Sequence, residues 1–295
     1  MCGRSGTKQC YKNEKGVVMK KLFMLILLGV MFGSIGFCED YACPNTYVLN
    51  SGFSKFLSNA TGGNFFYTKA LEQVLEKQAK KEFKGKFDVK LKSFSKKDLK
   101  EGKFKSITAT GENIDIDGVS IQKITLNSLC EYNQFAKNDS GKYEFVTDFP
   151  AALTFELTPQ NINQIKNMPE FKTKLDKINS ELKGFLKISD MNFDLKDDKL
   201  IYDINYILPF SPNEQKISVS ADVAYFNNTV YNQTETANGK SVVLNFFKMT
   251  NALNYINPLD FSIKFLQNNN VAGSVQNVYI RDNKVFVEAL LNITK

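Results

Sequence analysis

The 295-residue sequence predicts an α+β fold with antiparallel strands. Short runs in which apolar and polar residues alternate recur along the chain, with the two-residue period of half-buried strands. In two other segments, apolar residues return every three or four positions, which indicates helices. A helix followed by several strands occurs twice, at residues 68–157 and 158–293, and no Pro- or Ser-rich linker separates the two. We therefore expect one domain over residues 65–295, built of two helix-plus-meander halves, after a lead-in at residues 39–64.

The first half begins with a helix and continues as strands. Thr68 is of a type that caps helix N-termini, and Gly85 is expected to end the helix. The apolar stripe of this helix contains Leu71, Val74 and Leu75. The strand that follows alternates through Phe87, Val89 and Leu91.

A tight hairpin is expected at Asp117-Gly118, because glycine takes positive φ without strain. Asp115 and Asp117 also form an Asp-x-Asp pair, whose side chains share one face of an extended strand and could approach a metal ion. The sequence singles out no third acidic ligand for this pair. Since the hairpin alone explains Asp117-Gly118, we favour a turn over a metal site.

The second half repeats the pattern. Thr158 and Pro159 suit the cap and the first position of a helix. A longer helix follows Pro169, and its apolar stripe contains Phe171, Leu175, Ile178 and Leu182. Strands then return, with a turn at Asp197-Asp198. The last strands alternate through Phe261, Ile263 and Phe265 and through a closing hairpin at residues 278–293.

Residues 1–38 predict an export signal rather than part of the fold. Lys20 and Lys21 precede an apolar segment at residues 22–37, and small residues follow its core. This segment is shorter than the roughly 20 residues of a comfortable membrane span. We favour cleavage after Cys38 over an uncleaved anchor. Acylation of Cys38 is disfavoured because Phe37 stands where a small residue is required. The expected location is the periplasm or the cell envelope.

The net charge argues against nucleic acid as a partner. The whole chain carries 38 basic and 31 acidic residues, but residues 1–38 hold six of the former and one of the latter. The remainder has 32 basic and 30 acidic residues, a net charge of +2. Lysines gather between Lys77 and Lys105, where they could meet anionic lipid headgroups of a membrane surface. A merely solvated face is the interpretation that we favour for them.

Two cysteines, Cys43 and Cys130, remain after cleavage at Cys38. An even number in an oxidising compartment permits one disulfide, but the sequence separation alone does not decide whether it forms.

The chain contains no histidine, which removes the commonest general base and the commonest zinc ligand. Histidine-based nucleophile systems cannot be built, and no Gly-rich phosphate loop follows a strand. We therefore expect no enzyme activity, cofactor or metal. The 25 phenylalanines indicate either a packed β core or a wall around an apolar cavity, and composition alone favours the core.

One passage resembles a known family. It runs from Asp98 to Leu126 and contains Leu99, Gly102, Lys103, Phe104, Asp117, Gly118 and Val119 in the order and spacing of the LmeA-like phospholipid-binding proteins of bacteria. The C-terminal half is also similar, at residues 257–261 and in the closing hairpin. The resemblance covers residues 65–293.

This resemblance implies an elongated, curved antiparallel sheet wrapped around two or more long helices, with an apolar channel that holds an acyl chain. It also implies an envelope location, no catalysis, and phospholipid or another acyl-chain lipid as the partner. The residues expected to line the channel are Leu71, Val74, Leu75, Phe87, Val89, Leu91, Phe171, Leu175, Ile178, Leu182, Phe261, Ile263 and Phe265. Close packing of these side chains is the alternative, in a structural or interaction protein of the envelope.

Overall fold

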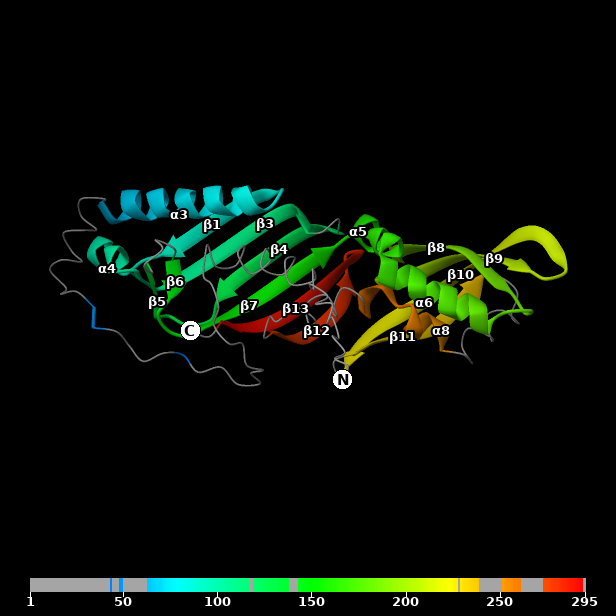
Figure 1. Ribbon diagram of the computed structural model, residues 1–295. Helices are drawn as coiled ribbons and strands as arrows, with labels where there is room; N and C mark the ends of the chain where they lie inside the picture. Colours follow the sequence, from blue (N-terminus) through cyan, green and yellow to red (C-terminus); the bar gives the residue numbers. More distant parts are fainter. Residues whose placement is uncertain are drawn as a thin grey trace, which may run out of the picture.

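The computed structural model confirms an α+β fold with antiparallel sheets. Figure 1 shows an elongated molecule in which two sheets follow one another along the long axis. The export segment and the predicted lining residues Phe261, Ile263 and Phe265 lie outside the described part of the chain. The structure describes residues 43, 48–49, 63–116, 119–137, 143–227, 229–238, 251–260 and 273–293.

The larger sheet has six strands. In order across the sheet they are β1 (Lys86–Lys92), β3 (Ser106–Ile116), β4 (Val119–Ser128), β7 (Phe149–Leu157), β13 (Lys284–Ile293) and β12 (Gly273–Arg281). Ile116 pairs with Val119, so the two residues between β3 and β4 give the connection the length of the predicted hairpin. The closing hairpin β12–β13 joins this sheet beside β7, although it follows the second half in sequence.

The second sheet has four strands. In order they are β11 (Thr229–Asn238), β10 (Ser211–Phe226), β9 (Lys199–Leu208) and β8 (Lys187–Lys196). Asp197 and Asp198 connect β8 to β9 with φ angles of 52° and 57°, so the turn predicted there is confirmed. A small third sheet contains β2 (Lys103–Phe104), β5 (Asn133–Lys137) and β6 (Tyr143–Phe145).

Only one described helix is long, which corrects the expectation of two or more. The helices are α3 (Gly63–Glu82), α4 (Lys96–Lys100), α5 (Pro159–Gln164), a 3₁₀ turn (Ile165–Asn167), α6 (Pro169–Glu181) and α8 (Ala252–Tyr255). Thr158 caps α5 as predicted, in a reciprocal capping box with Asn161. Pro169 starts α6 anew after the 3₁₀ turn, which divides the second helical region into short pieces.

The start of α3 also differs from the prediction. The helix begins at Gly63, one turn and more before Thr68. Thr68 is buried in the helix, and its hydroxyl lies 3.2 Å from that of Ser93 at the end of β1. Threonine marks caps because its hydroxyl bonds to nearby backbone, but here a side-chain partner on a neighbouring strand satisfies it.

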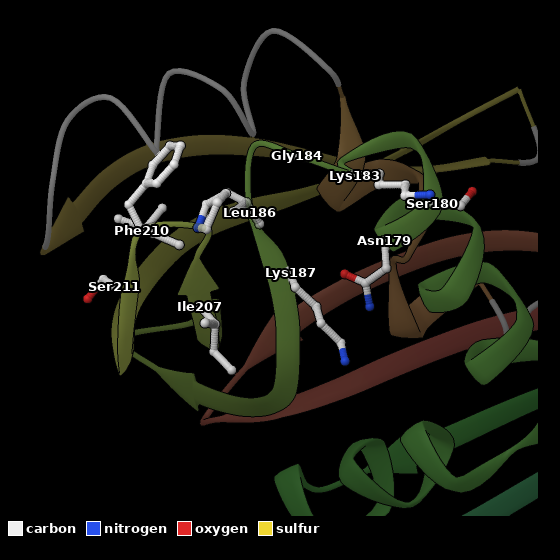
Figure 2. Close-up of a pocket in the computed structure, with 11 residues that line it drawn as sticks. Asn179, Ser180, Lys183, Gly184, Leu186, Lys187, Ile207, Phe210 and Ser211 are labelled. Atoms are coloured by element: carbon white, nitrogen blue, oxygen red, sulfur yellow. The ribbon is translucent and has the colours of Figure 1, made fainter.

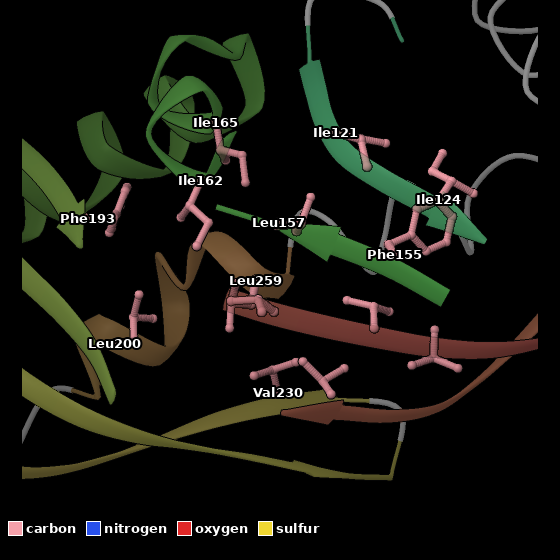
Figure 3. Close-up of a cluster of buried hydrophobic side chains, with 14 of the residues drawn as sticks. Ile121, Ile124, Phe155, Leu157, Ile162, Ile165, Phe193, Leu200, Val230 and Leu259 are labelled. Carbon is pink, nitrogen blue, oxygen red and sulfur yellow. The ribbon is translucent and has the colours of Figure 1, made fainter. Parts of the chain in front are cut away.

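Both sheets share one hydrophobic core. Alternate residues of β7 and β13 are buried, including Leu153, Phe155, Val285 and Val287. Figure 3 shows how the core continues from this sheet through Leu157 and Ile162 to Leu200 of β9. Buried side chains of both halves therefore belong to one contiguous cluster.

Helix side chains pair with the backbone of one edge strand in each large sheet, β1 and β8. At the β1 edge, the backbone N–H groups of Leu91 and Val89 donate to the carboxylates of Glu72 and Glu76 on α3, at 2.7 and 3.3 Å. An edge strand otherwise presents unpaired backbone groups to solvent and to other chains.

Amides perform the same task at the β8 edge. The N–H of Phe193 donates to Oδ1 of Asn163 at 2.9 Å, and the Asn163 amide donates to the Phe193 carbonyl. Asn179 on α6 pairs in the same way with both backbone groups of Ile188, at 2.8 and 3.0 Å.

Asn163→Ala should lower the free energy of unfolding by roughly 1–3 kcal/mol, because two backbone groups of the β8 edge lose their partner. Urea denaturation measures this change. Asn205→Ala is the matched control, since its amide makes an exposed contact at 3.5 Å to Glu214. Equal losses in the two variants would contradict the role assigned to Asn163.

Candidate functional site

The predicted lining residues of the first half lie between α3 and the larger sheet. Leu75 is buried, and Leu71 is partly buried against the core. Val74 is 51 % exposed and is not among the residues that line this space. The helix face that is turned towards the sheet carries Leu71, Leu75 and Ala79, which are four residues apart, and Val74 lies beside this face.

The space between α3 and the sheet is almost filled by side chains. We call it the α3 seam, and it has a volume of about 30 Å³, little more than a water molecule needs. Its lining carries no charged side chain and comprises Leu75, Ala79, Phe87, Val89, Ile107, Ala109, Thr110, Gly111, Ile124, Leu126 and Leu153. Leu91 is buried but does not line the seam. A space of this volume has no room for an acyl chain.

The side chains of the stripe predicted on the helix of the second half are mainly buried. Phe171, Ile178 and Leu182 are buried, and Leu175 is partly buried against them. The ring of Phe171 meets that of Phe193 on β8 edge to face, with centroids 5.8 Å apart. Ile178 and Leu182 also border an open space of about 600 Å³ towards β11 and α8. The stripe therefore packs against β8 at Phe171, while Ile178 and Leu182 also face the space beside β11 and α8.

A larger groove lies where α6 ends, and Figure 2 shows its lining. We call it the α6 groove, and its volume is about 760 Å³. The apolar part of its lining comes from Leu186, Ile207, Leu208, Pro209 and Phe210. The polar part comes from Asn179, Ser180, Lys183, Lys187 and Ser211, with Gly184 between them. This volume falls within the roughly 300–1,000 Å³ of ligand pockets.

The local sequence explains the shape of the α6 groove. α6 ends at Glu181, and Gly184 has a φ of +90°, which turns the chain towards β8. Asn179 holds the start of β8 through Ile188, which keeps the helix end and the strand in place. Phe210, in the turn between β9 and β10, is 99 % exposed. The groove therefore lies between a fixed helix end and an exposed aromatic turn.

The charged side chains that line the α6 groove are all positive. Lys183 and Lys187 are exposed, and none of the described residues that line the groove is Asp or Glu. An apolar floor with ammonium groups at its rim suits an amphipathic molecule that carries an anionic head.

No sequence pattern pointed to the α6 groove, because its apolar residues come from the connection before β8, the end of β9 and the turn that follows rather than from one stripe. The available signal was local. Phe210 follows Pro209 in a turn between two alternating strands, where an exposed aromatic ring is unusual.

The described residues offer little for catalysis or metal binding. No group of three or more Cys, Asp or Glu side chains among them could hold a metal ion. Burial raises the pKa of the Tyr202 phenol well above its usual range, while a hydrogen bond from the Asn232 amide acts in the opposite direction. Tyr202 therefore stays protonated in the core. Within the described ranges, no helix has the length and apolar character needed to cross a membrane.

The cysteine pair forms a disulfide. The sulfur atoms of Cys43 and Cys130 are bonded, and the two Cα atoms lie 5.5 Å apart. The bond ties the lead-in to the connection between β4 and β5, where the Asn133 amide also donates to the Cys130 carbonyl at 2.8 Å. Closing a loop of this size stabilises the fold mainly by restricting the unfolded chain.

No protein-family model, curated protein or solved structure matches the chain.

Leu99, Gly102, Lys103 and Phe104, which carry part of the family resemblance, have structural tasks in this chain, whereas Asp117 and Gly118 lie outside the described residues. Leu99 and Phe104 are buried, and Lys103 donates to the Val48 carbonyl at 3.1 Å. Gly102 has a φ of +77°, and a Cβ atom there would lie 1.9 Å from the carbonyl oxygen of Phe135. This passage therefore positions the small third sheet against the end of β1.

Gly102→Ala should be much more destabilising than Gly184→Ala. Both glycines have positive φ, which costs a side chain about 1–2 kcal/mol. A Cβ at Gly184 meets nothing within 4 Å, whereas one at Gly102 collides with backbone. We expect an additional loss of about 2 kcal/mol or more at Gly102, measured by urea denaturation. Similar losses at the two positions would show that the close approach to Phe135 is easily relaxed.

Proposed function

We propose that this protein binds an acyl-chain lipid, such as a phospholipid, without catalysis. The observation that carries the proposal is the α6 groove, which combines an apolar floor, a lysine rim and about 760 Å³ of space. An acyl chain would lie on Leu186, Ile207 and Leu208, and an anionic headgroup would meet Lys183 or Lys187. Such binding requires an apolar surface shielded from water and no reactive side chain.

Burial of the acyl chain would supply the main favourable free energy of this binding. Each buried methylene contributes about 0.8 kcal/mol. Ten buried methylenes would contribute roughly 8 kcal/mol, before the costs of association and chain ordering subtract several kcal/mol.

The resemblance to the LmeA-like family supports the same function and adds a channel along the larger sheet. The uncharged lining of the α3 seam is compatible with that channel. Loading it would require α3 to move away from β1, which breaks the bonds of Glu72 and Glu76 to the β1 backbone. The α6 groove requires no such movement.

Export to the periplasm or cell envelope is part of the proposal. It rests on the basic and apolar pattern of residues 1–38 and on the disulfide between Cys43 and Cys130, a bond typical of oxidising compartments.

Protein purified without detergent from its native compartment should contain lipid. Extraction with organic solvent and mass spectrometry should detect an acyl-chain lipid in near-stoichiometric amount. Lipid-free protein that also takes up no added phospholipid would overturn the proposal.

Leu208→Trp should fill part of the α6 groove and lower phospholipid uptake at least tenfold. The melting temperature should change little, because an open groove accepts added volume that a packed core rejects. Ile201→Trp is the matched control, since Ile201 is half-buried on the same strand, β9, and does not line the groove. Unchanged uptake by the Leu208→Trp protein would remove the groove from the lipid site.

A second candidate is a structural or interaction protein of the envelope. The closely packed α3 seam favours it, because the larger sheet then needs no ligand to complete its core. A fully folded protein that carries no lipid and binds one envelope protein would support this alternative.

A further inference from the structure

Two large aromatic side chains are exposed on the first turn of α3. Phe65 is 61 % exposed and Phe66 is 71 % exposed, and their rings meet edge to face with centroids 5.8 Å apart. Neither ring contributes to the hydrophobic core of the described residues. Exposed apolar side chains that lie together mark interaction surfaces more often than single ones do.

This turn is fixed to the end of the larger sheet. Asn64, next to Phe65, accepts a hydrogen bond at 2.9 Å from the hydroxyl of Ser93, which follows β1. Ser93 also lies 3.2 Å from the Thr68 hydroxyl. Figure 1 shows the start of α3 and the short helix α4 side by side at this end of the molecule. The aromatic pair is therefore held beside α4.

The same end is rich in lysine. Lys92, Lys96, Lys97 and Lys100 are all exposed. The acidic residue among them, Asp98, is fully buried and bonds to the Ser95 hydroxyl at 2.5 Å. The next one, Glu101, accepts a bond from Lys103 at 2.9 Å. Exposed lysines thus lie on and next to α4, the helix beside the turn that carries the exposed rings.

We propose that this end, defined by Phe65, Phe66 and the lysines of α4, docks onto the surface of an anionic lipid bilayer. Aromatic rings insert at the level of the headgroups, and lysines nearby are attracted to anionic lipids. Each lysine at such a surface raises the affinity about fivefold. The proposal does not rest on the α6 groove, which lies at the opposite end of the molecule (Figure 1).

The absence of tryptophan from the sequence permits a direct test. Phe66→Trp introduces a single fluorophore whose emission shifts to shorter wavelength when it enters a bilayer. Phe226→Trp is the control, because Phe226 is 65 % exposed at the end of β10. Both proteins keep the same N-terminal residues, so any contribution of that segment is equal.

With vesicles that contain phosphatidylglycerol, we expect a blue shift at position 66 and none at position 226. The shift should weaken in high salt and with phosphatidylcholine alone, because charge attraction is screened or lost. No shift at position 66, or an equal shift at both positions, would overturn the proposal.

Charge removal tests the lysines separately. Replacing Lys96, Lys97 and Lys100 with Gln should weaken binding to the anionic vesicles about 100-fold, measured by co-sedimentation. The matched control replaces Lys77, Lys80 and Lys81, which lie towards the other end of α3, and should bind nearly as the parent does. Equal weakening would mean that net charge alone attracts the protein, which contradicts a docking end.

These results are independent of the proposed lipid site. A protein that docks onto vesicles but contains no lipid would retain this inference and lose the function proposed for the α6 groove. A protein that contains lipid but does not dock onto vesicles would retain the function proposed for the α6 groove and lose this inference.

Discussion

Helix side chains pair with the backbone of one edge strand in each large sheet, β1 and β8, and this pairing determines where α3, α5 and α6 lie. Backbone groups at the edge of a sheet need partners, and β1 and β8 obtain them from carboxylates and amides rather than from another strand. Glutamate can only accept, so α3 satisfies the N–H groups of Val89 and Leu91. Asparagine both donates and accepts, so Asn163 and Asn179 each imitate a short piece of strand. A helix bound in this way is fixed along the edge in register with the sheet.

This edge attachment explains why the two halves offer such different spaces. α3 runs beside the edge strand β1, and its buried residues close the seam almost completely. α6 is anchored by Asn179 close to its C-terminus, and the chain must then turn at Gly184 to enter β8. The turn holds Lys183 and Leu186 apart from the β9–β10 connection, and the α6 groove remains between them. The groove is therefore a consequence of where the helix is attached.

Local patterns predicted the elements better than their arrangement. Alternation identified β1 and β7, and turn chemistry identified the Asp197-Asp198 connection, because both depend on neighbours in sequence. The pairing of β13 with β7 could not be predicted, since an alternating strand fits the edge of any sheet. The stripe at Phe171–Leu182 correctly indicated a buried face, but periodicity does not distinguish a face packed against a sheet from one that lines a cavity. The α6 groove escaped prediction because it is assembled from element ends.

Phenylalanine illustrates why composition could not locate a site. Among the described residues, Phe104, Phe149 and Phe171 are almost completely buried, whereas Phe65, Phe66 and Phe210 are mostly exposed. The exposed rings contribute nothing to the core, and they raise the risk of association, so their retention needs another reason. Their positions supply one: Phe65 and Phe66 lie beside α4, and Phe210 borders the α6 groove. Apolar surface accompanied by lysines at each of the two ends of an elongated molecule is the observation from which both the proposed lipid site and the proposed docking end are argued.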